Sequence, residues 1–420
     1  MPEKEISPAL PQQKLRRLGI LADGFMDWGG GIDFIRMVVS SIAAADPDIE
    51  LHLLLPSHGP RLTALRALRA VKRGFYNHIL GYKIMVPKRP NSEHIAELIQ
   101  GSGASIQAHL IDAGSRAIAS AARNLHLEAV LPAINPLNLG KDLPWLGYIY
   151  DYQHVHLPHL FSLQEIERRN QNFARMLDRS PCVIVNASAV ANDIKRYHPH
   201  HKAKVLSLPF SAAPNPAWLE LSPPPLEKYG ILGPYFIVSN QFWQHKDHLT
   251  IWRAFAELRD AYPEVQLVCT GETHDYRNPE YTSTLATEAH RLNITERLHI
   301  LGLIPKSDQI SLMRGAVAVI QATWNEGGPG GGAIYDAVSL GVPSIVSDIT
   351  VNLELNEPTV RFFAKGNVEA LATAMRERLQ SPSYEPPSAE RLIAEGLRRR
   401  RACGDTLLRA IQELQDNRYN

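Results

Sequence analysis

Short apolar runs alternate with amphipathic stretches along most of the chain. Residues 18–22 and 51–55 are predicted as buried strands, and residues 32–45 between them carry a helical pattern. The alternation continues to residues 205–208. Buried strands that alternate with helices are typical of a parallel α/β sheet, so we predict one in this half of the chain.

Seven prolines fall within residues 209–234 and interrupt the alternation. Proline does not fit a regular helix interior, so we predict an interdomain linker here. The pattern then resumes, with strands predicted at 235–239, 265–269 and 298–301. The predicted organisation is a disordered lead-in at 1–14, a first Rossmann-like domain at 15–212, a second at 213–388, and a helix at about 389–420 that can pack back on the first domain.

Two glycine clusters lie where predicted strands give way to helices. Residues 29–31 follow the first strand, and residues 324–337 join a strand at 316–320 to a helical pattern at 333–340. The second cluster holds five glycines and one glutamate, Glu326. Glycine lets a ligand approach the backbone, and a helix N-terminus offers free N–H groups to an anion. This cluster therefore predicts a site for a phosphorylated ligand that carries hydroxyls.

Composition and charge narrow the class of protein. A net charge of +1 gives no global attraction to nucleic acid. The three cysteines are widely spaced and form no CxxC motif, which suits a reducing compartment. No apolar run is long enough to span a membrane, and residues 1–13 carry no apolar signal core. We therefore expect a cytoplasmic protein without a membrane span.

Four stretches, in chain order, resemble motifs of one enzyme family. Residues 29–32 (GGGI) match its N-terminal glycine loop, and residues 151–162 (DYQHVHLPHLFS) match a segment of a bacterial polysaccharide-assembly branch. Residues 239–248 (SNQFWQHKDH) match a second segment of that branch, and residues 326–348 match the donor motif. The chain thus resembles the GT-B glycosyltransferases, and within them the retaining family 4 (glycosyltransferase group 1), O-antigen assembly branch. The resemblance implies two doubly wound Rossmann-like domains that face a central cleft.

The resemblance also implies roles for particular residues. The second domain would bind a nucleotide-sugar donor, and the first domain the acceptor. Glu326 would accept hydrogen bonds from sugar hydroxyls, Lys246 would meet the leaving diphosphate, and His154 would bond a donor-sugar hydroxyl or assist the acceptor; these are the candidate catalytic residues. The candidate donor-binding residues are Asn240, Gly327, Gly328, Gly330, Gly331, Gly332 and Asp336. The candidate contacts from the first domain are Gly29, Gly30 and Gly31.

Two positions depart from the family pattern. Nine residues separate Glu326 from Asp336, which is longer than the usual spacing between the family's two acids. Asn240 stands where the family often has an arginine, so phosphate neutralisation is expected to rest on Lys246 and on backbone N–H groups. By resemblance, Asp336 would bind ribose hydroxyls. Its alternative is a first-turn acid that only complements the helix dipole.

Each candidate also has a structural alternative. Glu326 can be a solvated acid in a flexible loop, Lys246 a surface lysine, and residues 29–31 a plain turn. The histidines between 154 and 159 can bind zinc, but no matching Cys or carboxylate spacing supports a metal site. Residues 61–90 hold eight cations and no acid, with leucines near helical spacing. This segment is either a basic amphipathic helix for an anionic membrane surface or an ordinary helix with solvated cations.

The resemblance implies a retaining, metal-independent glycosyltransferase that needs no cofactor. It would move a hexose, with a mannose-type sugar favoured, from a GDP-, UDP- or dTDP-linked donor to a hydroxyl of a glycan or lipid-linked glycan. We expect no nucleic-acid partner. Peripheral contact with the inner membrane face through 61–90 is expected only if that segment is the membrane-binding helix. Two rivals are a nucleotide-sugar epimerase and a non-catalytic nucleotide-sugar-binding scaffold. A Rossmann dehydrogenase is disfavoured because no G-x-G-x-x-G follows the first strand.

Overall fold

The computed structural model describes residues 15–26, 29–57, 106–140, 142–381 and 384–419. The predicted lead-in at 1–14 and the basic segment at 61–90 lie outside these residues. Among the helices that are described, none combines the length and the apolar character needed to cross a membrane.

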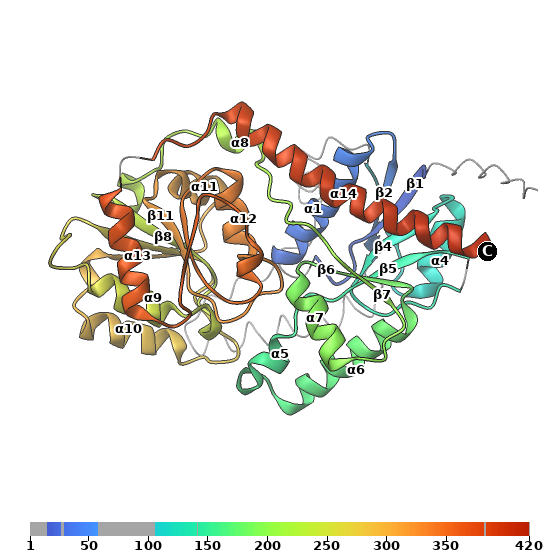
Figure 1. Ribbon diagram of the computed structural model, residues 1–420, viewed down its shortest axis with the longest axis horizontal. Coiled ribbons are helices and arrows are strands. Elements are labelled where there is room, and N and C mark those ends of the chain that lie inside the picture. Colours follow the sequence, from blue (N-terminus) through green and yellow to red (C-terminus); the bar gives the residue numbers. More distant parts are fainter. Residues whose placement is uncertain (1–14, 27–28, 58–105, 141, 382–383, 420) are drawn as a thin grey trace, which may run out of the picture.

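Two parallel sheets lie side by side, one in each domain (Figure 1). In the described residues the first sheet has the order β3-β2-β1-β4-β5-β6-β7 and the second the order β10-β9-β8-β11-β12-β13. The first sheet comprises β1 (Arg17–Leu21), β2 (Glu50–Pro56), β3 (Ile106–Ile111), β4 (Ala129–Ala133), β5 (Trp145–Tyr148), β6 (Cys182–Val185) and β7 (Lys204–Ser207). The second comprises β8 (Tyr235–Ser239), β9 (Gln266–Thr270), β10 (Leu298–Gly302), β11 (Ala318–Gln321), β12 (Ser344–Ser347) and β13 (Val360–Phe363). The predicted fold class, two doubly wound α/β domains, is confirmed.

Both faces of each sheet are covered, which explains the continuous apolar runs in the strands. In β8, Phe236 and Val238 join the core beneath the helices α9, α10 and α13, whereas Tyr235 and Ile237 join the opposite core. In the described part of the first domain the helices are α1 (Gly29–Ala45), α4 (Ser115–Asn124), α5 (Gln153–His156), α6 (Leu163–Arg179) and α7 (Ser188–Tyr197). Those of the second are α8 (Pro216–Leu219), α9 (His248–Ala256), α10 (Tyr281–Arg291), α11 (Lys306–Gly315), α12 (Gly331–Ser339) and α13 (Val368–Gln380).

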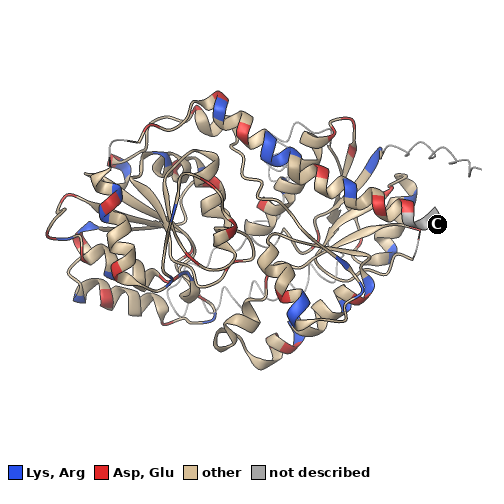
Figure 2. Ribbon diagram, viewed as in Figure 1, with Lys and Arg blue, Asp and Glu red and all other residues tan. Residues whose placement is uncertain are grey.

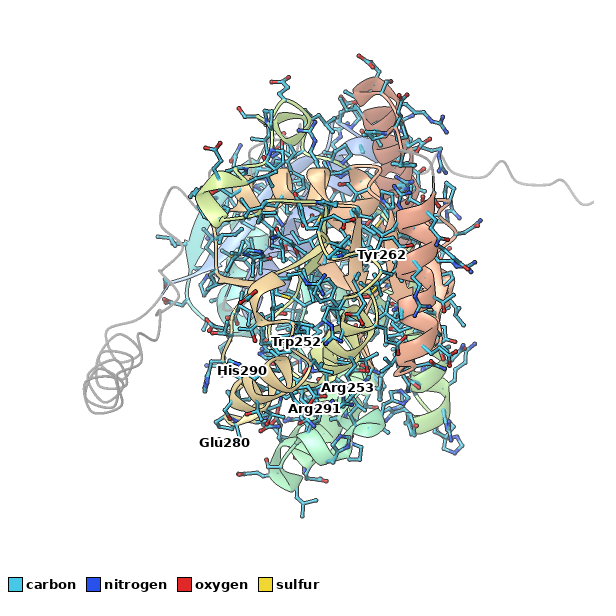
Figure 3. The ribbon with its side chains drawn as sticks, turned by 90° about the vertical axis from the view of Figure 1, so that its left-hand side faces the viewer. Trp252, Arg253, Tyr262, Glu280, His290 and Arg291 are labelled. Carbon is cyan, nitrogen blue, oxygen red and sulfur yellow. The ribbon has the colours of Figure 1, made fainter. Side chains whose placement is uncertain are left out.

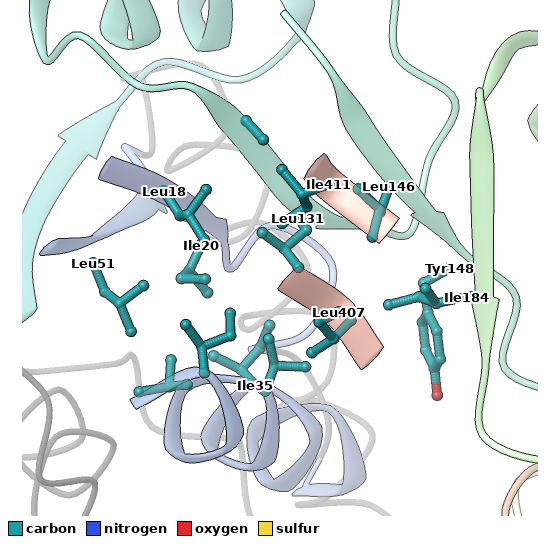
Figure 4. Close-up of a cluster of buried hydrophobic side chains, with 14 of the residues drawn as sticks. Leu18, Ile20, Ile35, Leu51, Leu131, Leu146, Tyr148, Ile184, Leu407 and Ile411 are labelled. Carbon is teal, nitrogen blue, oxygen red and sulfur yellow. The ribbon is translucent and has the colours of Figure 1, made fainter. Parts of the chain in front are cut away.

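The last helix, α14 (Ala389–Tyr419), follows the second domain but packs against α1 of the first (Figure 1). Leu407 and Ile411 are fully buried and lie beside Leu131 and Ile35 in the core of the first domain (Figure 4). The two helices approach closely at Gly404, where a Cβ would stand 1.9 Å from the carbonyl oxygen of Ser41. This helix ties the two domains together.

The glycine clusters are partly helical. α1 begins at Gly29, so residues 29–31 form its first turn and not a loop that ends before residue 32. In the same way α12 begins at Gly331, two residues before the predicted start. Glycine leaves the first turn of a helix without side chains, so its backbone N–H groups stay open to neighbours. The residues just before α1, Asp27 and Trp28, lie outside the described part of the chain.

Candidate functional site

The turn from β11 to α12 requires glycine at two positions. Gly330 and Gly331 have φ values of +72° and +56°, in the left-handed region. A Cβ at Gly330 would also stand 2.3 Å from the Cβ of Ile334. The Gly330 N–H donates to Asn352 Oδ1 at 2.8 Å, and Asn352 is fully buried. The turn is therefore held by Asn352, the first residue of a short 3-10 helix, η5 (Asn352–Glu354), that follows β12.

Gly327 and Gly328 face the first domain. A Cβ at Gly327 would stand 1.9 Å from the carbonyl oxygen of Tyr150, and one at Gly328 would stand 3.1 Å from the Cβ of Asn186. Tyr150 and Asn186 follow β5 and β6, so the carboxyl ends of the first sheet meet the glycine segment here. Close backbone approach between the domains thus explains these two glycines without any ligand. Their predicted donor contact stays a prediction.

Gly332 differs from the other four glycines of this segment. Among the described residues, and apart from its chain neighbours and the backbone of its own helix, no atom lies within 4 Å of the position its Cβ would take. Its φ lies outside the left-handed region. Alanine in this first helical turn would favour the helix by about 1 kcal/mol. Neither packing nor backbone geometry therefore explains glycine at this position.

Lys246 and Glu326 come from separate motifs and form a buried ion pair. Lys246 ends a short 3-10 helix, η3 (Gln244–Lys246), directly before α9. Its Nζ donates to Glu326 Oε1, and the two side chains are only 9% and 12% exposed. Gln321 Nε2 lies 3.3 Å from the same carboxylate oxygen. A charge-assisted bond in this setting holds both groups at the carboxyl end of the second sheet.

Asn240 follows β8 at the same end of the sheet. The residue is 7% exposed, and its Nδ2 has no hydrogen-bond partner among the described residues. A buried amide donor without a partner is unfavourable, which makes Asn240 a candidate to donate to a bound acceptor group.

Asp336 is paired with a lysine and not with the glycine turn. Lys306, the first residue of α11, donates through Nζ to Asp336 Oδ2. Burial raises the pKa of the Asp336 carboxyl above its ordinary value, and Lys306 partly offsets this shift. Asp33 and Arg36 of α1 also act on this carboxyl across the domain interface.

His154 is enclosed in the first domain. Its side chain is fully buried, its ring lies 5.5 Å from that of Phe173 and 5.8 Å from that of Tyr152, and Nε2 lies 2.9 Å from Asn170 Oδ1. Nδ1 has no partner among the described residues. Burial lowers the pKa of His154, so the ring is neutral at neutral pH. Its predicted contact with a sugar would require its surrounding side chains to shift.

The nearby histidines do not converge on one point. His156 pairs with Asp193 at 2.7 Å, and His159 is exposed. No set of three or more potential metal-ligating side chains comes together in the described parts of the chain.

Two interdomain contacts were not anticipated from the sequence. Arg277, between β9 and α10, donates to Gln153 Oε1 of the first domain at 2.9 Å. Glu354 of the second domain accepts from the backbone N–H groups of Ser188 and Ala189, at the start of α7, at 2.9 and 2.7 Å. Both residues follow strands of the second sheet, and only this position in the sequence could have indicated that they lie near the site.

A cavity of about 430 Å³ opens elsewhere on the second domain, between β13 and α13. Phe363, Asn367 and Thr373 are among the residues that line it. None of the predicted site residues is among them, so we locate the candidate site by its side-chain chemistry at the carboxyl ends of the strands.

Comparisons with known proteins bear on the fold and on the second domain. Residues 232–399 match the family described as glycosyl transferases group 1. No curated protein sequence matches the chain significantly. Among solved structures, Anabaena Alr3699/HepE in complex with UDP and glucose is similar with a TM-score of 0.56 at 14% identity, covering 96% of this chain and 99% of its own.

Two further solved structures are similar over nearly their full lengths. Sucrose-phosphate synthase from Thermosynechococcus elongatus has a TM-score of 0.59 at 15% identity, covering 96% of this chain and 98% of its own. A glycosyltransferase from Rickettsia africae has a TM-score of 0.61 at 14% identity, covering 96% and 100%. The chain therefore has the two-domain GT-B fold, and most of its second domain matches the glycosyl transferases group 1 family.

Proposed function

We propose that the protein is a retaining glycosyltransferase that moves a hexose from a nucleotide sugar to a hydroxyl of a glycan or lipid-linked glycan. The observation that carries the proposal is the buried Lys246–Glu326 pair beside the glycine start of α12. The pair places a cation (Lys246) and a carboxylate that can accept hydrogen bonds from hydroxyls (Glu326) beside a helix N-terminus. The domain that holds them matches glycosyl transferases group 1.

The donor diphosphate is bound by Lys246 and by the first turn of α12. Its arrival releases Lys246 from Glu326, because the phosphate oxygens replace the carboxylate as the partner of Nζ. Gly332 supports this reading, since a ligand against the backbone explains a glycine that packing leaves unexplained. Asn240 adds a neutral donor through its unpartnered Nδ2. GDP, UDP and dTDP are the candidate nucleotides. The structure of the similar Anabaena protein is that of a complex with UDP.

The released Glu326 carboxylate accepts hydrogen bonds from sugar hydroxyls. Asp336 binds the ribose hydroxyls once Lys306 has moved aside, and Gly29, Gly30 and Gly31 approach the ligand from the first domain. The acceptor lies against the first domain near His154. A mannose-type hexose is the favoured sugar, and bacterial polysaccharide assembly at the inner membrane face is the proposed setting. Segment 61–90 would provide the membrane contact.

The reaction breaks the bond between the anomeric carbon and the diphosphate oxygen and forms one from the same face to the acceptor oxygen. Negative charge builds on the leaving diphosphate, and the fixed charge of Lys246 stabilises it. The leaving phosphate oxygen takes the acceptor proton, so no protein base is required. Lys246 and the backbone N–H groups of α12 take the place of a metal ion at the diphosphate. The configuration at the anomeric carbon is retained.

A transfer assay over a panel of GDP-, UDP- and dTDP-sugars, with and without glycan acceptors, tests the proposal. We expect acceptor-dependent transfer that a chelator leaves unchanged. Glu326→Ala should lose at least about 100-fold in turnover, the range for a lost transition-state contact. Glu377→Ala, at an exposed pair with Arg361 on the outer face of α13, is the matched control and should keep the wild-type rate.

The rivals give different products in the same assay. An epimerase converts the nucleotide sugar without an acceptor, and a scaffold binds nucleotide without turnover. Either result, or a near wild-type rate for Glu326→Ala, overturns the proposal.

A further inference from the structure

Arg277 connects the two candidate halves of the site. It lies in the second domain, after β9, and its side chain is only 7% exposed. Its Nη1 donates to Gln153 Oε1 of the first domain at 2.9 Å. Its Nη2 lies 3.1 Å from Nδ1 of His245 in the second domain. Because a guanidinium only donates, His245 Nδ1 must be the acceptor. One planar group thus bonds both domains at once.

Aromatic rings from both domains enclose the same guanidinium. Its carbon lies 5.2 Å from the ring centre of Phe161 in the first domain. It lies 5.1 Å from the ring of Trp243 and 5.4 Å from that of Tyr276 in the second. The nearest carboxylate, that of Asp275, stands 3.7 Å from Nε, and Nε has no hydrogen-bond partner among the described residues. Stacked rings and neutral acceptors hold the cation, and the buried carboxylate of Asp275 adds a longer ion pair.

The partners of Arg277 are the immediate neighbours of the candidate catalytic residues. Gln153 precedes His154 in α5, and the ring of Phe161 lies 6.4 Å from that of His154. His245 precedes Lys246 in η3. The carbonyl oxygen of His245 also accepts from the Trp324 N–H at 2.8 Å, two residues before Glu326. Figure 1 shows α5 on the side of the first domain that faces the second.

We propose that Arg277 is a positioning residue that holds the α5 turn carrying His154 in register with the η3 turn carrying Lys246. It acts through Gln153 and His245 and does not itself contact the reacting atoms. The proposal rests on the proposed function for its effect on catalysis, but the mechanical coupling it describes exists with or without turnover. Lysine cannot replace this arginine, because an ammonium lacks the planar fork that bonds in two directions and stacks on rings.

The test compares Arg277→Met and Arg277→Lys with Arg253→Met. Arg253, on α9, pairs with Glu288 on the outer face of the same domain, where Arg291 also pairs with Glu288 (Figure 3). We expect both Arg277 variants to lower kcat by roughly 10- to 100-fold, as for a reacting group displaced by about 1 Å. Nucleoside diphosphate affinity should stay within about twofold, because Lys246 and the α12 turn remain intact. Arg253→Met should match the wild type in both.

Hydrogen exchange supplies a readout that does not depend on turnover. The amide of Leu157 donates to the Gln153 carbonyl at 2.8 Å, and it should exchange at least about tenfold faster in both Arg277 variants although the substitution lies in the other domain. Arg253→Met should leave it unchanged. Unchanged exchange in the Arg277 variants, or an unchanged kcat, overturns the positioning role. If the wild type transfers no sugar from any donor, the proposed function fails and the exchange result alone decides the coupling.

Discussion

At the scale of single residues, charged side chains of the candidate site form ion pairs with one another. Lys246 pairs with Glu326, and Lys306 pairs with Asp336. Each carboxylate was predicted to bind hydroxyls, and Lys246 to bind phosphate. The pairs are the natural resting arrangement, because a buried charge without a partner is strongly unfavourable. The motifs predicted that Lys246 and Glu326 belong to one site, and the structure pairs them, but the pairing of Lys306 with Asp336 had no signal in the sequence.

His248, two residues after Lys246, makes stability depend on pH. Its ring is fully buried, stacks on Phe242 at 4.3 Å, and has no hydrogen-bond partner among the described residues. Burial, with a further contribution from Lys246, lowers its pKa from 6.5 to about 3. Between these values the unfolded chain binds a proton that the folded protein does not. Stability conferred by the neutral ring is therefore complete above pH 6.5 and falls as the pH drops toward 3.

We expect this one histidine to contribute a loss of about 1.4 kcal/mol in the free energy of unfolding for each pH unit below 6.5. His248→Phe keeps the stacking with Phe242 and removes the titrating group. Its free energy of unfolding should therefore fall with decreasing pH by about 1.4 kcal/mol per pH unit less than that of the wild type. Urea denaturation at several pH values between 5 and 7.5 measures both slopes. Equal slopes for wild type and variant would contradict the assigned burial.

At the scale of elements, apolar alternation predicted the strands and most helices because both faces of each sheet are buried. Helix starts were less accurate, since glycine carries no hydrophobic signal and α1 and α12 both begin within glycine clusters. Helix α14 likewise has one buried face and one exposed face. Leu407 is fully buried in the first domain, whereas Leu397 is 46% exposed on the same helix.

Leu407→Ala should lower the free energy of unfolding of the first domain by about 2 to 5 kcal/mol, because it leaves a cavity in a closely packed core. Leu397→Ala, the same change at an exposed position, should stay within about 0.5 kcal/mol of wild type. Urea denaturation followed by a signal from the first domain measures both. A similar small effect of the two changes would mean that α14 does not stabilise that core.

At the scale of the whole molecule, the fold followed from pattern, whereas the contacts between domains did not. Residues of both charges are spread over the helices of both domains, in line with the net charge of +1 (Figure 2). The interdomain contacts of Arg277 and Glu354 join segments more than 100 residues apart. No local period encodes such pairs. Gly327 illustrates the limit best, because its sequence context indicated a ligand and the structure adds a backbone neighbour, Tyr150.

The proposed function requires that Lys246 and the start of α12 bind the diphosphate of a nucleotide sugar. Titration calorimetry with UDP, GDP and dTDP on wild type, Lys246→Ala and Lys228→Ala tests it most directly. Lys228 is an exposed lysine of the same domain that pairs with Asp308, so it is the matched control. We predict that one nucleotide binds the wild type and Lys228→Ala equally, and binds Lys246→Ala at least about tenfold more weakly, as for a lost charged hydrogen bond. Equal affinity in all three proteins, or no binding of any nucleotide, would overturn the proposed binding of the diphosphate by Lys246.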